Sequence, residues 1–199
     1  LPEEVLERYR REESGLALYD FLLEELRRQK EHVLSPAEEQ IIALVGEAIQ
    51  APDSIFRMLN NADISFPKIL DETGNEIEIT HGRYTRLLES RDRRMRKDAF
   101  KAFYSSYRGL KNTIAATLSS SVKRDIFYAR VRKHPSALQA SLFEDNIPPE
   151  VYDNLIQTVR GHLGLMHRYT ALRKRLLGLD ELHMYDLYVP VVKDVPWEI

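Results

Sequence analysis

The sequence predicts a mainly α-helical protein, with a multi-helix array around one long helix (about Ser90–Lys133), one β-hairpin (about Phe66–Thr80) and a short C-terminal strand. The long stretch contains no proline and a single glycine, Gly109. Apolar residues recur along it in steps of three or four, which marks one helical face: Met95, Ala99, Phe103, Tyr107, Leu110, Ile114, Leu118, Val122 and Ile126. Unbroken, such a helix would be on the order of 60 Å long.

The N-terminal third reads as consecutive helices. Pro2–Arg11 predicts a short helix, because proline is tolerated in a first turn, and Gly15 separates it from a second helix. The strongest local signal follows, where Ser35 is an N-cap, Pro36 takes the first helical position and Glu38 completes a capping box. This pattern predicts a third helix that begins at Pro36.

The periodicity then changes from helical to alternating. Phe66–Leu70 and Glu76–Thr80 flank the glycine-containing loop Asp71–Asn75, a pattern typical of a β-hairpin. A lone hairpin is marginally stable in water, so it should lie on helices or join a sheet supplied elsewhere.

Capping residues delimit the helices that follow. Thr80 should cap a short helix, and Ser90 should cap the long one, with Asp92 in the first turn where the helix dipole favours a negative charge. Further helices are expected over Pro135–Phe143 and from the Pro148-Pro149 pair, the latter with breaks near Gly161 and Gly164 and a final C-terminal glycine, Gly178. His183–Pro190 reads as the extended C-terminal strand.

The composition limits the classes of function. With 199 residues, 43% of them hydrophobic and 30% charged, the chain has the profile of a soluble globular protein. Its formal net charge of −2 gives no general attraction to nucleic acid or anionic membranes. The lack of cysteine excludes disulfides and thiolate metal sites and fits a reducing, cytoplasmic interior. No apolar run approaches the roughly 18–20 residues of a membrane span.

Known catalytic motifs are not found in the sequence. His162 and His167 are five residues apart, or roughly 140° apart on a helix, so they cannot chelate one ion from a regular helix. The sequence contains no His-Glu-x-x-His, Gly-x-Ser-x-Gly, phosphate-binding loop or dinucleotide-binding fingerprint. We interpret the histidines as surface or helix-terminal residues, and we find no complete active site.

Two other groups of residues have a functional and a structural interpretation. The basic cluster consists of Arg91, Arg93, Arg94, Arg96, Lys97 and Lys101, and it could contact phosphates. However, Asp92 lies four residues before Arg96 and Asp98 three before Lys101, a spacing that favours an ion-paired helix surface without nucleic acid. Tyr185, Asp186 and Tyr188 could line a substrate cleft. Their spacing alone favours simple alternation of a buried and an exposed face.

Many ordered segments of the chain resemble one known family, oligoendopeptidase F. The segments are Asn60–Asp63, Phe66–Ile69, Thr80–Tyr84, Leu87–Arg94, Arg96–Phe100, Ala137–Phe143, Asn146–Pro148, Val151–Leu155 and Tyr185–Pro190. The resemblance covers nearly the whole chain in the same order, which makes chance agreement a poor explanation.

This resemblance implies a zinc metalloendopeptidase, related to thimet oligopeptidase, that hydrolyses short peptides inside a channel enclosed by helices. The family's zinc site is a His-Glu-x-x-His helix plus a later glutamate, and the motif's own glutamate activates the water. Because the motif is missing here, residues 1–199 correspond to a single helical segment before the catalytic region. The resemblance assigns no catalytic or metal-binding residue to this chain and no zinc to this segment.

The expected role is therefore a scaffold and channel wall that is inactive alone and needs the missing catalytic half. Tyr185, Asp186 and Tyr188 gain weight as cleft-lining residues, because they lie where the chain approaches that half. The opening Leu1-Pro2, without an initiator Met, and the ending at Ile199 give the same expectation of an excised piece. Such a piece should expose a large apolar surface. The alternative is a stand-alone helical module that binds a peptide or nucleic acid.

Overall fold

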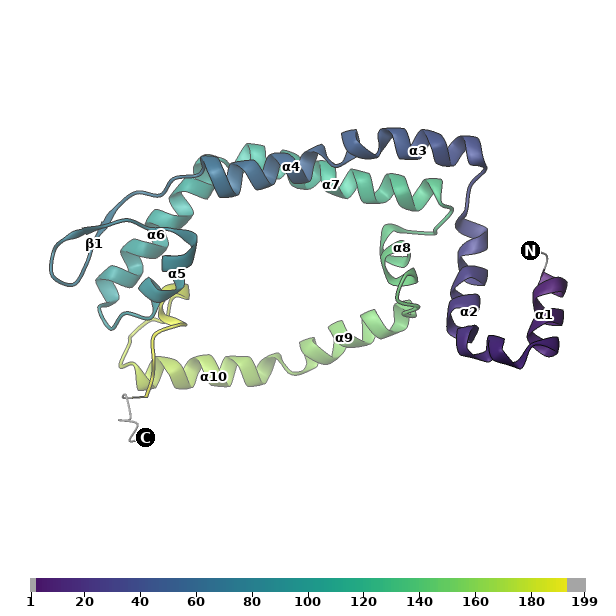
Figure 1. Ribbon diagram of the computed structural model, residues 1–199. Helices are drawn as coiled ribbons and strands as arrows, with labels where there is room; N and C mark the ends of the chain where they lie inside the picture. Colours follow the sequence, from purple (N-terminus) through teal and green to yellow (C-terminus); the bar gives the residue numbers. More distant parts are fainter. Residues whose placement is uncertain (1–2, 193–199) are drawn as a thin grey trace. The chain divides into compact units, whose positions relative to one another are not determined.

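The chain folds as a series of helices with one small hairpin, so the mainly α prediction is confirmed (Figure 1). The computed structural model describes residues 3–192. Its contacts divide the chain into two compact units. Unit 1 holds residues up to Gln50 together with Lys123–Asn146, and unit 2 holds Ala51–Val122 and the residues from Ile147 onward. Each unit is described by itself.

Unit 1 is built from helices alone within its described residues. They are α1 (Glu3–Glu12), η1 (Ser14–Tyr19), α2 (Asp20–Gln29), η2 (Lys30–His32), α3 (Pro36–Ile49), the C-terminal end of α7 (Lys111–Val131) and α8 (Ala137–Phe143). The predicted capping box opens α3. The Ser35 backbone N–H donates to Glu38 Oε2 at 2.9 Å, and the Glu38 N–H donates to Ser35 Oγ at 3.4 Å.

Unit 2 contains the hairpin and the helices around it. Its elements are α4 (Ala51–Met58), η3 (Leu59–Asp63), β1 (Ile69–Leu70), β2 (Glu76–Ile77), α5 (His81–Leu88), α6 (Arg93–Gly109), the start of α7, α9 (Pro149–Gly161), α10 (Leu163–Leu176) and η4 (Met184–Asp186). Thr80 caps α5 as predicted, because its hydroxyl accepts from the Arg83 N–H at 3.2 Å.

The predicted single long helix is wrong in two details. Leu110 leaves helical geometry (φ −101°, ψ 10°) and separates α6 from α7. The preceding Gly109 weakens the helix there, since glycine costs about 1 kcal/mol in a helix interior. The N-cap is Asp92 instead of Ser90: the Asp92 carboxylate accepts from the Arg94 N–H at 2.9 Å, whereas Ser90 Oγ accepts from the Asp92 N–H at 3.0 Å.

The hairpin packs on helices, which is one of the two arrangements that its marginal stability allows. β1 and β2 are antiparallel, with Ile69 opposite Ile77 and Leu70 opposite Glu76. Asp71 shapes the turn by accepting from the backbone N–H groups two and four residues ahead, at 2.8 Å and 2.9 Å. Gly74, at φ +90°, takes the left-handed conformation that the turn requires.

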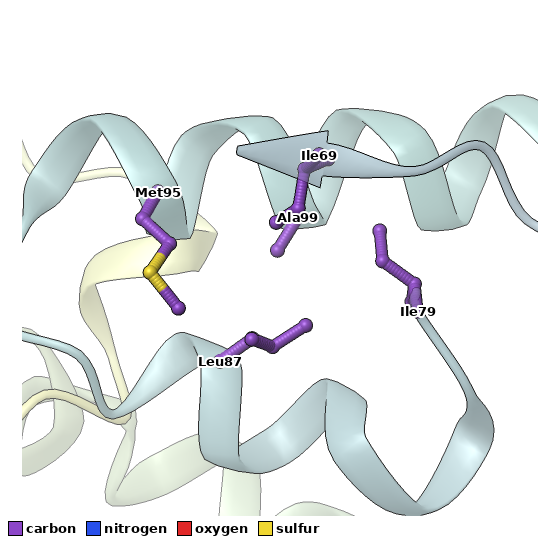
Figure 2. Close-up of a cluster of buried hydrophobic side chains, with 5 residues drawn as sticks. All are labelled: Ile69, Ile79, Leu87, Met95 and Ala99. Carbon is purple, nitrogen blue, oxygen red and sulfur yellow. The ribbon is translucent and has the colours of Figure 1, made fainter. Parts of the chain in front are cut away.

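A hydrophobic cluster holds the hairpin on α5 and α6. Figure 2 shows its buried members, whose side chains point toward one another from the hairpin and both helices: Ile69, Ile79, Leu87, Met95 and Ala99. Met95 and Ala99 are two of the positions predicted for the apolar face of the long helix. Farther along that face, on α7, Leu118 and Val122 are 65% and 49% exposed. The predicted apolar face is therefore buried at its start and uncovered in α7.

The predicted C-terminal strand is also wrong. Met184–Asp186 form the 3₁₀ helix η4, and no β-strand occurs in the described part of the chain after α10. The Asp186 N–H donates to the His183 carbonyl at 2.9 Å, and the His183 N–H donates to Asp186 Oδ2 at 3.0 Å. A short polar side chain that bonds its own neighbouring backbone competes with extended structure. Among the described residues, no helix is both long enough and apolar enough to cross a membrane.

Candidate functional site

One buried carboxylate joins the start of α6 to the segment after α10. Arg93 and Arg96 lie three residues apart, and therefore on one face of α6. Arg93 contacts Asp186 through two hydrogen bonds, from Nε to Oδ1 at 3.2 Å and from Nη2 to Oδ2 at 3.0 Å. Arg96 Nη2 donates to Oδ1 at 2.7 Å. The Asp186 side chain has no exposed surface, so this is a buried ion pair with two partners.

The arginines keep Asp186 ionised. Burial by itself raises the pKa of Asp186, but hydrogen bonds from Arg93 and Arg96 and from the His183 N–H outweigh burial, so the pKa lies below its ordinary value. The hydrogen bonds that Arg93 donates to Asp186 in turn raise the pKa of Arg93. At neutral pH the site therefore contains a carboxylate anion paired with two guanidinium cations.

A third arginine, Arg173 on α10, fixes the backbone of the same segment. Its Nη2 donates to the carbonyls of Asp186 at 3.1 Å and Val189 at 2.6 Å. Arg96 adds a bond from Nε to the Tyr185 carbonyl at 3.1 Å. We call Arg93, Arg96, Arg173 and Asp186 the Asp186 hub. The hub ties residues 185–189 to both α6 and α10, and Arg173 Nε is buried there without a hydrogen-bond partner among residues 3–192.

The three residues predicted to line a cleft differ in exposure. Tyr185 is 8% exposed; its ring stacks on His183 with centroids 4.9 Å apart and lies below the Arg93 guanidinium at 5.5 Å. Asp186 is the centre of the hub. Tyr188 is 56% exposed. A cleft-lining role stays a prediction for all three, with Tyr188 presenting the most side chain to solvent.

Tyr188 belongs to a group of tyrosines from separate elements. Burial raises the pKa of Tyr84 on α5, and the neighbouring hydroxyls of Tyr104 on α6 and Tyr188 raise it further. Tyr104 is 46% exposed. The Tyr84 hydroxyl is therefore a neutral hydrogen-bonding group at neutral pH, and the hydroxyls of Tyr104 and Tyr188 lie close enough to influence it.

Three arginines of the basic cluster make ion pairs within the protein itself. Arg93 and Arg96 belong to the hub. Arg94 pairs with Asp92 at 3.0 Å and with Asp98 at 3.5 Å, and its guanidinium also donates to the carbonyls of Leu70 and Asp71 in the hairpin. Helix spacing predicts that Asp92 pairs with Arg96 and Asp98 with Lys101, whereas in the structure both aspartates pair with Arg94. Arg96 instead binds Asp186, which lies 90 residues away and which helix spacing cannot predict.

The histidines of unit 1 form a second polar group. His32 and His134 stack with centroids 3.8 Å apart and an interplanar angle of 12°, and the ring of Phe143 lies edge-on to both. They line a pocket of about 620 Å³ that also includes Arg132. Parallel stacked imidazoles cannot aim their lone pairs at one ion, and no group of three His, Cys, Asp or Glu side chains suited to a metal occurs among residues 3–192.

The stacked pair makes unit 1 sensitive to acid. Burial lowers the pKa of His134 below 6.5, and His32 and Arg132 lower it further. A base with a depressed pKa binds its proton less readily in the folded state, so stability should be lost as pH falls from 6.5 through the lowered pKa. We expect His134→Phe, which keeps a stacked ring, to reduce this loss in urea unfolding followed across that range.

The control for this prediction is His167→Phe, because His167 is an exposed histidine on α10. It should leave the pH dependence of unfolding unchanged. An identical pH dependence in wild type and His134→Phe would contradict the prediction.

Comparison with known proteins identifies the family that this chain resembles. Family models described as "Oligopeptidase F" and "Peptidase family M3" match residues 1–66 and 86–194. The chain is 49% identical to oligopeptidase PepF of Bacillus subtilis over 199 residues, all of this chain and 30% of that protein. It is 45% identical to group B oligopeptidase PepB of Streptococcus agalactiae over 180 residues, or 90% of this chain and 30% of that one.

A solved structure gives the same result. Oligoendopeptidase-F from Enterococcus faecium superposes with a TM-score of 0.92 at 44% identity, over 99% of this chain and 38% of that chain. The present chain thus spans about 30% of the length of the curated relatives described above. With a family model matched over more than half of its residues, the chain belongs to peptidase family M3.

Proposed function

We propose that this chain is the N-terminal and central helical portion of a zinc-dependent oligoendopeptidase that hydrolyses short peptides in an enclosed channel. The observation that carries the proposal is the match of 99% of this chain to only 38% of an oligoendopeptidase, at a TM-score of 0.92. The matched portion contains no His-Glu-x-x-His motif. In this proposal the segment acts as scaffold and channel wall, and the remaining polypeptide supplies catalysis.

The side chains of this segment do not suit a zinc site. No three candidate ligands come together within the described chain, and the stacked histidines are oriented unfavourably. We therefore assign zinc to the longer protein and derive no catalytic step from the residues of this chain. Its contribution is to confine peptides and to position the segment that leads toward the catalytic region.

The Asp186 hub supports this positioning role. Because Arg96 and Arg173 hold the backbone carbonyls on both sides of it, the exposed Tyr188 side chain starts from a fixed segment. The held carbonyls are those of Tyr185, Asp186 and Val189. We propose that Tyr188 faces the channel, while Asp186 and Tyr185 keep the segment in place. A fixed hydroxyl can bind a peptide group at little cost in conformational entropy.

The setting proposed for the full protein is the cytoplasm, with short peptides as substrates and without nucleic acid or membrane partners. The lack of cysteine fits a reducing compartment. The engagement of Arg93, Arg94 and Arg96 by Asp186, Asp92 and Asp98 supports a structural role for the basic cluster.

The chain by itself is expected to be inactive. Purified protein of residues 1–199 should cleave no quenched fluorescent peptide and should hold no stoichiometric zinc in elemental analysis after dialysis, because the ligands of the zinc motif are not in its sequence. One tightly held zinc per chain, or peptide cleavage that copurifies with the chain, would show that the proposal is wrong.

A further inference from the structure

The helices α9 and α10 of unit 2 present apolar stripes that nothing in the described chain covers. On α9, Val151, Leu155 and Val159 recur every four residues and are 55%, 60% and 54% exposed. No residue of α9 is buried. The stripe of α10 consists of Leu165, Tyr169, Leu172 and Leu176, which are 57%, 51%, 40% and 57% exposed.

A short helix whose apolar stripe is uncovered is not expected to be stable by itself. Helices shorter than about 12–15 residues are marginal in water, and most helical stability in proteins comes from packing of the apolar face. With 13 residues and no buried side chain, α9 lacks that contribution. Its four-residue spacing forms the type of ridge that packs into the groove of another helix.

We infer that the α9 and α10 stripes are the docking surface for a helical, apolar surface of the polypeptide that family M3 relatives carry beyond the region matched by this chain. The inference rests on the proposal that the chain is one part of a longer peptidase. The matched region is 30% of the Bacillus subtilis protein and 38% of the Enterococcus faecium chain, so a large additional polypeptide is available to cover the stripes.

Positive charges beside the α10 stripe indicate the charge that the docking polypeptide should carry. A hollow of about 480 Å³ lies over the C-terminal end of α10 and is lined by Leu172 of the stripe together with Arg168, Lys174 and Arg175. These three cations make no ion pair within the described residues. The docking segment should therefore carry carboxylates beside its apolar face, because opposite charges at the rim favour one register over others.

The experiment compares the chain with a full-length chimera, in which this chain replaces its matched region in Bacillus subtilis PepF. Hydrogen exchange is followed in α9, with α6 as an internal reference for correct folding. The α9 amides should exchange roughly a hundredfold or more slowly in the chimera than in the chain alone, because burial removes local opening. Equal exchange of α9 in both proteins overturns the inference.

Two substitutions on opposite sides of α9 localise the effect. Leu155→Asp should return α9 of the chimera to rapid exchange, while Gln157→Asp, two residues along on the other face, should not. Leu155→Ala is the milder variant for the case in which aspartate prevents folding; it should speed α9 exchange with α6 unchanged. If Leu155→Ala leaves α9 exchange unchanged, α9 is covered through another face and the inference is wrong.

Two further outcomes separate this inference from its alternatives. Protection of α9 in the chain alone that rises with protein concentration would show a second copy as the occupant, and would overturn the inference. A chimera with protected α9 but no peptide cleavage would contradict the proposed peptidase function and leave the docking surface supported.

Discussion

Replacing Asp186 with asparagine should destabilise the chain by about 3–5 kcal/mol, the usual cost of removing one partner from a buried ion pair. The substitution keeps the shape of the side chain but leaves Arg96, which is 3% exposed, without its anion. It also weakens the attachment of this segment to α6, which keeps the Arg96 bond to the Tyr185 carbonyl. The free energy of unfolding in urea, followed by circular dichroism, measures the effect.

The matched control is Asp98→Asn. Asp98 also pairs with an arginine of α6, Arg94, but its side chain is 43% exposed and the distance is 3.5 Å. Exposed pairs contribute about 0–1 kcal/mol, so the control should change little. Similar losses in the two variants would show that the buried pair has no special role.

The pH dependence of stability gives a second readout for Asp186. Its pKa lies below the ordinary value of 3.8, so its stabilising contribution is present above that pH and is lost as pH falls through the lowered pKa. The Asp186→Asn variant should lose less stability over this acid range than wild type.

Replacing Ile79 with alanine should cost about 2–5 kcal/mol, the range for truncation of a large aliphatic core residue. Ile79 is 2% exposed and is a member of the cluster that packs the hairpin on the helices α5 and α6 (Figure 2). Because the hairpin has only a two-residue pairing on each strand, it depends on this cluster. Urea unfolding again measures the loss.

Leu70→Ala is the control for this substitution, since Leu70 is on β1 beside the buried Ile69 but is itself 49% exposed. Its truncation should cost well under half of the Ile79 effect, because less apolar surface returns to water. A larger loss from Leu70 than from Ile79 would contradict the assignment of the core.

Capping residues in the sequence correctly predict the helix ends that depend on residues close in sequence. The capping box of Ser35 and Glu38 starts α3, Thr80 starts α5, and Gly178 follows α10 with the positive φ of 64° expected of a C-terminal glycine. The predictions that failed involve competition between alternatives of similar energy. Ser90 and Asp92 are two good capping residues only two positions apart, and the Asp92 carboxylate is the one that caps α6.

The candidate site was less predictable, because its contacts are distant in sequence. The sequence predicts an extended segment that contains Tyr185, Asp186 and Tyr188, whereas the Asp186 carboxylate accepts from the His183 N–H and residues 184–186 form η4. The side-chain bonds that fix this carboxylate come from Arg93 and Arg96, 93 and 90 residues earlier. Spacing on α6 indicates that Arg93 and Arg96 share a face, but it cannot identify which carboxylate they bind.

The most direct test of the central claim is peptide cleavage by the chimera with Bacillus subtilis PepF, measured beside the chain alone. If this chain is the scaffold portion of a family M3 oligopeptidase, the chimera should hold zinc and hydrolyse short peptides, and the chain alone should do neither. A chimera that folds and binds zinc but cleaves no peptide would contradict the claim, as would peptide cleavage by the chain alone.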